Sequence, residues 1–361
     1  MTNTELNKTD LKYCTTFRVN RMLGISILYN ESKMKEYLNQ FFHFEQVDEV
    51  LNDTWIINCM NERYHQHLPV GITYEMELKE ECQELIIENN TAVRPKETKG
   101  IIIINKKLKQ VHIYNPDFRM LYIETYRVVR QILARELLKT SLMIHGSAVE
   151  VNGETFSFIG SKGRGKSTFI TGLLHKEINS KYICNDRYFI QDDSTIIQWP
   201  ECPAITYNTI ALFPELIDRI EHYSSSPKAF NPSEIFIDHP TLPDQYQISL
   251  DSNKHKKAFF TNKEFSLLLN RAIKPVSRLD HTIFLSPGKY EECEIITLNQ
   301  SMTKQHLIEN LDKLSSFPDW LKLEGNVMQG ERNFNHAPGY LFKRTFDFES
   351  DLNYFKQYFS L

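Results

Sequence analysis

A glycine-rich motif constrains what this 361-residue chain can fold into more than any other feature of its sequence. The segment GSKGRGKS, residues 160–167, matches the pattern G-x-x-x-x-G-K-[ST] at every position. Its glycines allow a tight loop whose consecutive N–H groups face inward and form a nest for anions. An apolar stretch precedes the loop, and a helix is predicted from Ser167 to His175, which would direct its dipole at the same anion. The motif therefore predicts a site for a nucleoside triphosphate, which we expect to be ATP with Mg²⁺.

The residues of this loop have separate expected roles. Lys166 can reach the β- and γ-phosphates, and Ser167 can bind Mg²⁺ through its hydroxyl. Arg164 can contact phosphate or remain solvated. The alternative for the whole motif is a chance match in a flexible loop. The residues expected to bind the nucleotide are Gly160, Ser161, Lys162, Gly163, Arg164, Gly165, Lys166, Ser167 and Thr168.

If the loop serves a kinase, a carboxylate is needed to hold Mg²⁺, and often another accepts the proton of the attacking hydroxyl. Asp186 is the best candidate, because Lys181–Cys184 is typical of a return strand that would bring it beside the loop. Its alternative role is to cap a turn at the end of that strand. Asp192-Asp193 lies between two apolar runs and is predicted to form a turn instead. His145, in an apolar run ahead of the loop, is either a hydrogen-bonded structural residue or a third site residue.

The composition argues against several classes of protein. Lys and Arg number 42 and Asp and Glu number 46, so the net charge is −4 and no basic surface for nucleic acid is predicted. The first residues, MTNTELNKTD, lack the apolar stretch of a signal peptide, and no apolar run suits a membrane helix. The six cysteines form no C-x-x-C pair, which argues against a zinc site and fits free thiols. We therefore expect a cytoplasmic protein without a nucleic-acid or membrane partner.

The pattern of apolar residues predicts an α/β fold in two parts. Short runs rich in Ile, Val, Tyr and Thr predict a smaller β-rich domain over residues 1–117, of unknown role, with a helix over Met34–Phe42. Apolar residues every three or four positions predict a helix over Phe118–Thr140, at the start of a P-loop domain that covers residues 118–361. Asn152-Gly153 between two apolar runs predicts a β-hairpin that leads into the loop.

Farther along the chain the signals are weaker. A helix is predicted over Thr303–Leu314, and the aromatic tail Tyr340–Phe359 is expected to pack on the P-loop domain. The basic run Lys254–Lys257 suits a solvated loop or, alternatively, a surface for an acidic peptide.

Three segments together resemble a known family. Ile144–Gly153, the loop at residues 160–167 and Asn185-Asp186 are similar to the catalytic domain of HPr kinase/phosphorylase and its relatives, among them kinases that phosphorylate ribosomally made peptides. In that family a His-containing strand, a hairpin strand, the P-loop and an acidic pair follow in this order. The resemblance implies a P-loop core on a mixed β-sheet, as in phosphoenolpyruvate carboxykinases. It also implies catalytic roles for Lys166, Asp186 and His145, with Ser167 and Asp186 as Mg²⁺ ligands.

The sequence departs from the family pattern at two places. The first acidic residue of the pair is replaced by Asn185, and an amide cannot act as the base that the family uses there. The glycine-rich signature downstream of the pair is missing, and WPECP at residues 199–203 occupies that region. The second departure argues against HPr itself as the acceptor.

Together these features predict an ATP-dependent kinase whose acceptor is a hydroxyl, expected to be Ser, on a peptide or protein. A ribosomal precursor peptide is one acceptor of this kind, and the sequence leaves room for an oligomer. Two alternatives stay open: a nucleotide-binding regulator or scaffold without transfer activity, which Asn185 favours, and a small-molecule kinase of the same fold.

Overall fold

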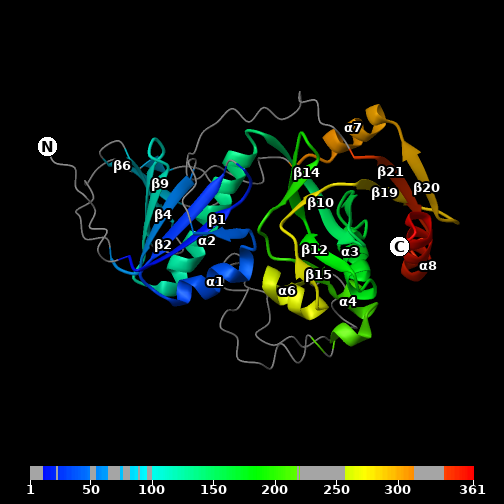
Figure 1. Ribbon diagram of the computed structural model, residues 1–361, viewed down its shortest axis with the longest axis horizontal. Coiled ribbons are helices and arrows are strands. Elements are labelled where there is room, and N and C mark those ends of the chain that lie inside the picture. The colour runs from blue at the N-terminus through cyan, green and yellow to red at the C-terminus, as the bar shows by residue number, and fades with distance from the viewer. Residues whose placement is uncertain are drawn as a thin grey trace. The chain divides into compact units, whose positions relative to one another are not determined.

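The computed structural model describes residues 11–21, 23–48, 54–63, 74–75, 82–87, 90–95, 100–217, 219, 257–312 and 337–361. Within these ranges the chain is a mixed α/β protein built on two large sheets (Figure 1). It divides into two compact units. The described residues of unit 1 lie within Met1–Asn39 and Phe44–Lys139, and those of unit 2 lie within Gln40–His43, Thr140–Lys313 and Met328–Leu361.

Unit 1 is built on a nine-stranded sheet with the order β3-β1-β2-β4-β9-β8-β7-β6-β5. The β2–β4 and β4–β9 pairs are parallel, and the other neighbours are antiparallel. Its strands are β1 Tyr13–Arg18, β2 Gly24–Tyr29, β3 Glu45–Val47, β4 Thr54–Met60, β5 Tyr74–Glu75, β6 Cys82–Ile87, β7 Asn90–Pro95, β8 Ile101–Asn105 and β9 Gln110–Tyr114. The runs rich in β-branched residues therefore form strands, as predicted from the sequence.

Two helices accompany this sheet: α1, Lys33–Phe41, most of which belongs to unit 1, and α2, Phe118–Leu137. The side chain of Asp117 caps α2 by accepting a hydrogen bond from the N–H of Arg119 at 2.9 Å. The expected helices are thus present. However, α2 belongs to unit 1, so the units divide after Lys139 and not after residue 117. The reason is packing, because the apolar face of α2 lies on β4 and β9 of the unit 1 sheet.

Unit 2 is built on a ten-stranded mixed sheet with the order β18-β14-β13-β10-β11-β19-β21-β20, and β12 pairs with β10 and β17. Its strands are β10 Ser141–Val151, β11 Glu154–Ile159, β12 Ser180–Cys184, β13 Arg187–Gln191, β14 Thr195–Gln198, β17 Ala272–Ile273, β18 Val276–Arg278, β19 His281–Lys289, β20 Glu294–Leu298 and β21 Gly339–Arg344. A separate pair joins β15 Ala204–Thr206 to β16 Lys257–Phe259. Its helices are α3 Lys166–Lys176, α4 Tyr207–Ala211, α6 Asn262–Leu269, α7 Gln300–Glu309 and α8 Phe348–Phe359.

The hairpin predicted at Asn152-Gly153 joins β10 to β11. Both residues have positive φ, 52° and 91°, as a two-residue turn of this type requires. Strand β10 is longer than its partners, so its first half pairs with β13 and its second half pairs with β11 and β12. The change of partner falls at Gly146, and this position organises the site described below.

Alternate residues along the central strands enter two apolar clusters on opposite faces of the unit 2 sheet. One cluster includes Phe156 and Phe158 of β11 and Phe169 of α3, and the other includes Ile159. The C-terminal tail joins the first cluster through β21 and α8, where Phe355 is fully buried, so the expected packing of the aromatic tail is confirmed (Figure 1).

The helix predicted over residues 303–314 is α7, which begins and ends earlier than expected. Asn299 caps its first turn, and the helix ends at Glu309. The chain then leaves the helix because Leu311 forms a β-bridge with Ile144 of β10. The basic run at residues 254–257 lies outside the described residues except for Lys257, which is in β16.

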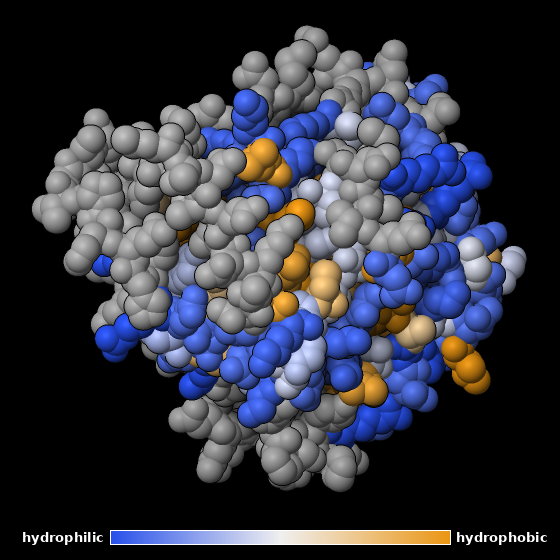
Figure 2. Space-filling view, turned by 60° about the vertical axis from the view of Figure 1, so that its left-hand side comes forward, coloured by the Kyte–Doolittle hydropathy of each residue, from blue (hydrophilic) through white to orange (hydrophobic). Residues whose placement is uncertain are grey.

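The described surface is mostly hydrophilic on the face shown in Figure 2, where hydrophobic residues appear as scattered orange areas among blue ones. Scattered exposed apolar residues are normal on folded proteins and mark no particular partner. Among the described residues, no helix combines the length and apolar character needed to cross a membrane.

Candidate functional site

The loop at residues 160–165 joins β11 to α3, so the strand–loop–helix context that the motif requires is present. Gly163 and Gly165 have φ values of 84° and 80°, which L side chains rarely adopt. Gly165 is the N-cap of α3 and offers no side chain to the free N–H groups of the first turn. These N–H donors point out of the N-terminal end of α3, where the helix dipole is positive. Both features favour the binding of an anion at this end.

Lys166 is 7% exposed, and its ammonium group is held by the loop itself. Nζ donates hydrogen bonds to the carbonyl oxygens of Gly160 at 2.6 Å and Ser161 at 3.4 Å. The ammonium group therefore lies within the curve of the loop, where it can exchange a carbonyl for a phosphate oxygen. This position fits the role expected of it from the motif.

The other polar residues of the loop differ in how freely they could reach a ligand. Arg164 donates from Nη1 to the carbonyl of Pro287 and from Nε to the hydroxyl of Ser161 at 3.3 Å. Thr168 shares a hydrogen bond of 2.8 Å with Thr209 of α4. Ser161 and Lys162 are exposed, and Ser167 is half-buried at the start of α3.

Asp186 lies at the corner where β12 ends and β13 begins, next to Gly146 of β10. The N–H of Gly146 donates to the carbonyl of Asp186 at 3.0 Å, and the same Gly146 pairs with Ile159, the last residue before the loop. The return strand predicted from the sequence is thus β12, and it brings Asp186 to the end of the sheet from which the loop emerges.

His145 and Asp186 form a pair at this corner. Nδ1 of His145 lies 3.7 Å from Oδ1 of Asp186, and Oδ2 of Asp186 lies 3.2 Å from Nη1 of Arg187. Burial lowers the pKa of His145, while the charge of Asp186 raises it and the charges of Lys166 and Arg187 lower it further. His145 is therefore mainly neutral at pH 7.

Three residues of this corner were not predicted as site residues: Arg187, Glu201 and Asp312. Arg187 pairs with Glu201 at 2.8 Å and with Asp312 through Nε. Burial alone would lower the pKa of Arg187, but the carboxylates of Glu201, Asp186 and Asp312 raise it above its ordinary value. Arg187 directly follows Asp186 in the sequence, so its position could have indicated a site residue. Asp312 has none, because it arrives through the pairing of residues 310–312 with β10.

Asn185 is 7% exposed and makes a contact that needs an amide. Its Nδ2 donates to the carbonyl of Ala204 at 3.0 Å, and its backbone carbonyl accepts a hydrogen bond from the hydroxyl of Ser147. A carboxylate at this position has no hydrogen to donate and would face the Ala204 oxygen. Asn185 therefore has a structural role in this chain.

The oxygens of Ser167 and Asp186 are of the kind that Mg²⁺ binds. Among the residues that the structure describes, no three or more His, Cys, Asp or Glu side chains are arranged to hold a metal ion. Mg²⁺ commonly binds through one or two protein oxygens, with water and phosphate oxygens completing its octahedron. Ser167 and Asp186 are the residues expected to supply these protein oxygens.

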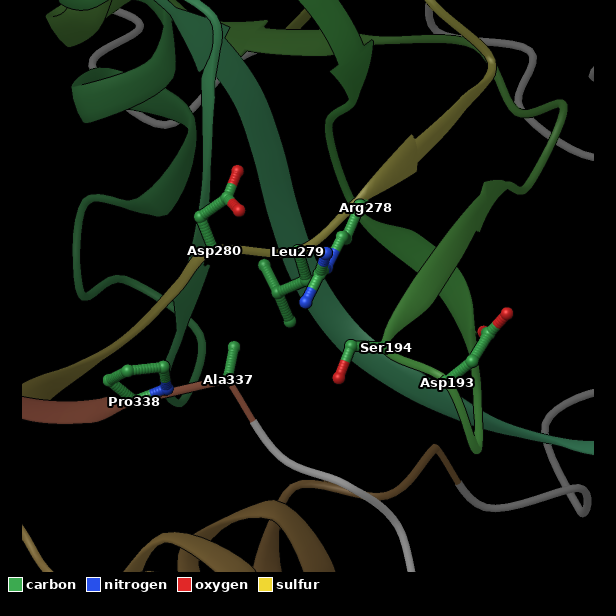
Figure 3. Close-up of a pocket in the computed structure, with 7 residues that line it drawn as sticks. All are labelled: Asp193, Ser194, Arg278, Leu279, Asp280, Ala337 and Pro338. Atoms are coloured by element: carbon green, nitrogen blue, oxygen red, sulfur yellow. The ribbon is translucent and has the colours of Figure 1, made fainter.

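A separate pocket of about 250 Å³ lies at the other end of the unit 2 strands. Figure 3 shows the residues that line it. It is lined by Asp193, Ser194, Arg278, Leu279, Asp280, Ala337 and Pro338. Asp280 accepts a hydrogen bond from the N–H of Thr155, near the start of β11, whereas the loop follows the end of that strand. Asp193 accepts one from the N–H of Thr195, so the turn predicted at Asp192-Asp193 is confirmed.

The described geometry thus brings the glycine-rich loop, with its buried lysine, and the His145–Asp186 pair to the same end of the unit 2 sheet. The loop can hold a polyphosphate, and the pair can accept a proton from a hydroxyl beside it. In comparisons with known proteins, no protein-family model matches the chain and no curated protein matches its sequence.

Proposed function

We propose that this chain is an ATP-dependent kinase that transfers the γ-phosphoryl group to a hydroxyl, most simply that of Ser on a peptide or protein. One observation carries the proposal: the loop of residues 160–167 and the His145–Asp186 pair meet at Gly146, at one end of one sheet. A site that only bound phosphate would not need a proton acceptor beside its loop.

In this proposal each side chain has one task. Lys166 leaves the carbonyls of Gly160 and Ser161 and stabilises the transferring phosphoryl group. The acceptor oxygen forms a bond to the γ-phosphorus as the bond between that phosphorus and the bridging oxygen of ADP breaks. Asp186 takes the proton of the acceptor hydroxyl, and neutral His145, 3.7 Å from this carboxylate, orients the phosphate or the acceptor. Mg²⁺, held by Ser167 and Asp186, would supply neutralising charge for the phosphates.

The fold that supports this proposal best is the HPr kinase type of P-loop core. A hairpin, β10–β11, leads into the loop, and the sheet is mixed, as that resemblance implies. The acceptor would differ from HPr, because residues 199–203 replace the family's glycine-rich signature and Trp199 is buried.

A non-catalytic nucleotide binder is the second candidate, and one observation favours it. Asn185 uses its side chain to hold Ala204 and offers no basic group where the family carries a carboxylate. Phosphoryl transfer depends mainly on positioning and charge stabilisation, so the loss of one base slows a kinase without abolishing transfer. We therefore prefer a kinase with Asp186 as its only carboxylate base.

Calorimetry tests the nucleotide site. Wild type should bind Mg·ATP, and Lys166→Ala should weaken binding at least tenfold, because a buried charge-assisted contact contributes about 1.5–3 kcal/mol. Lys176→Ala is the matched control, since Lys176 lies at the far end of the same helix in an exposed pair with Glu349. Equal affinity of wild type and folded Lys166→Ala would refute the site.

A further inference from the structure

Arg344, the last residue of β21, lies behind the loop and is only 4% exposed. Its Nη2 donates a hydrogen bond to the carbonyl oxygen of Arg164. Its Nη1 fills the space beside Gly165, where an added Cβ would come within 2.9 Å of it. Arg164 and Gly165 of the motif are thus both in contact with a side chain that lies far from them in the sequence.

The charge of Arg344 has no carboxylate partner among the residues that the structure describes. Its guanidinium group packs over the rings of Phe169 at 5.4 Å and Phe346 at 4.6 Å, and its buried Nε makes no hydrogen bond there. Burial lowers the pKa of Arg344, and the charge of Asp351 offsets this effect only in part. A buried cation without a paired anion is costly.

Asp351 is the nearest carboxylate in electrostatic terms, but its oxygens are used elsewhere. Oδ1 accepts hydrogen bonds from the N–H of Thr345 at 2.8 Å and its hydroxyl at 2.9 Å, and Oδ2 accepts one from the N–H of Phe346 at 3.2 Å. These bonds fix the chain just after Arg344. The guanidinium group is therefore held in place while its charge is compensated only in part.

The peptide between Arg164 and Gly165 transmits this charge to the loop. The peptide is trans, so its C=O and N–H point in opposite directions. Arg344 donates a hydrogen bond to the C=O of this peptide, so the N–H of Gly165 points away from Arg344. No described group accepts a hydrogen bond from that N–H. A charge-assisted bond to the oxygen also polarises the N–H of the same peptide and makes it a stronger donor.

We infer that Arg344 is a positioning residue of the loop. Its hydrogen bond to the carbonyl of Arg164 holds the Arg164–Gly165 peptide so that the Gly165 N–H points at the phosphates of a bound nucleotide. The negative charge of these phosphates balances the charge of Arg344. This inference rests on the proposed nucleotide site and adds to it a residue outside the motif.

The test compares stability without ligand and affinity with ligand in Arg344→Met. Methionine keeps an apolar chain between the two rings, so the thermal unfolding midpoint without nucleotide should equal or exceed that of wild type. Affinity for Mg·ADP and Mg·ATP should fall about 10- to 100-fold, the range expected for one charge-assisted hydrogen bond. Arg344→Lys, which keeps a donor and a charge, should recover part of this affinity.

Lys343→Met is the control, because Lys343 is the neighbour of Arg344 in β21 but pairs with Glu294 on the surface. It should leave affinity unchanged. Wild-type affinity in Arg344→Met would overturn the inference, as would a loss of affinity matched by a lower unfolding midpoint and not relieved by lysine. Absence of Mg·ATP binding to wild type would refute the proposed function itself and this inference with it, whereas loss in Lys166→Ala but not in Arg344→Met would refute the inference alone.

Discussion

The substitution Asn185→Asp distinguishes the expectation drawn from the resemblance to HPr kinases from the expectation drawn from the structure. The resemblance to HPr kinases alone would imply that a carboxylate at this position speeds transfer. The structure predicts a cost, because Asp cannot donate to the carbonyl of Ala204, which Asn185 now holds at 3.0 Å. The carboxylate would also lie buried against that oxygen, because Asn185 is 7% exposed and its backbone carbonyl is held by the hydroxyl of Ser147.

The size of this cost follows from two terms. An unmade hydrogen bond that leaves a part-buried carbonyl unsatisfied costs about 1–3 kcal/mol. Burying a carboxylate without a donor adds to this, so we expect Asn185→Asp to lower the free energy of unfolding of unit 2 by about 2–4 kcal/mol. Asn185→Ala loses only the hydrogen bond and should lower it by about 1–3 kcal/mol.

Urea denaturation of wild type, Asn185→Ala and Asn185→Asp measures these differences, and transfer assays on the same samples measure rate. The expected order of stability is wild type, then Ala, then Asp, with no gain in transfer rate in the Asp variant. An Asp variant as stable as wild type and faster in transfer would refute the structural role assigned to the amide.

Further substitutions and conditions test other parts of the site. Asp186→Asn should lower Mg²⁺-dependent turnover about 10²–10⁴-fold with a smaller effect on nucleotide affinity, whereas Asp193→Asn, in a turn, should leave turnover unchanged in steady-state assays. His145 has a folded-state pKa below its ordinary value, so the unfolded state binds its proton more readily. Its contribution to stability is complete above about pH 6.5 and is lost as the pH falls below that value, and His145→Gln should reduce this acid dependence in denaturation curves. Burial raises the pKa of Cys59 to about 12, so a thiol reagent at pH 8 should modify exposed Cys14 and spare Cys59, as peptide mass spectrometry can verify.

Features that depend on neighbouring residues were predictable from the sequence. The turn at Asn152-Gly153 needs only two residues with positive φ, and the loop needs only its own glycines and the helix after it. The return of the chain to Asp186 was also predictable, because one helix and one short strand cover that distance. Each of these features is encoded within a short stretch of the sequence.

Features that depend on distant pairing were not predictable. Asp312 contacts Arg187 because the residues after α7 pair with β10, and no local sequence pattern predicts that contact. Arg344 reaches the loop only because β21 pairs with β19, which in turn pairs with β11. The same reason explains why α2 joins unit 1, since the face it packs on is formed by strands whose order no single segment specifies.

The most direct test of the proposed kinase activity is transfer of labelled phosphate from [γ-³²P]ATP to an acceptor. Wild type, Lys166→Ala and Asp186→Asn should be incubated with Mg²⁺ and with Ser-containing peptides, including ribosomal precursor peptides, and with HPr as a comparison acceptor. We predict label on a peptide Ser, identified by mass spectrometry, that is abolished in Lys166→Ala and strongly reduced in Asp186→Asn. Tight binding of Mg·ATP by wild type, with no label on any of these acceptors, would contradict the kinase and favour the non-catalytic nucleotide binder.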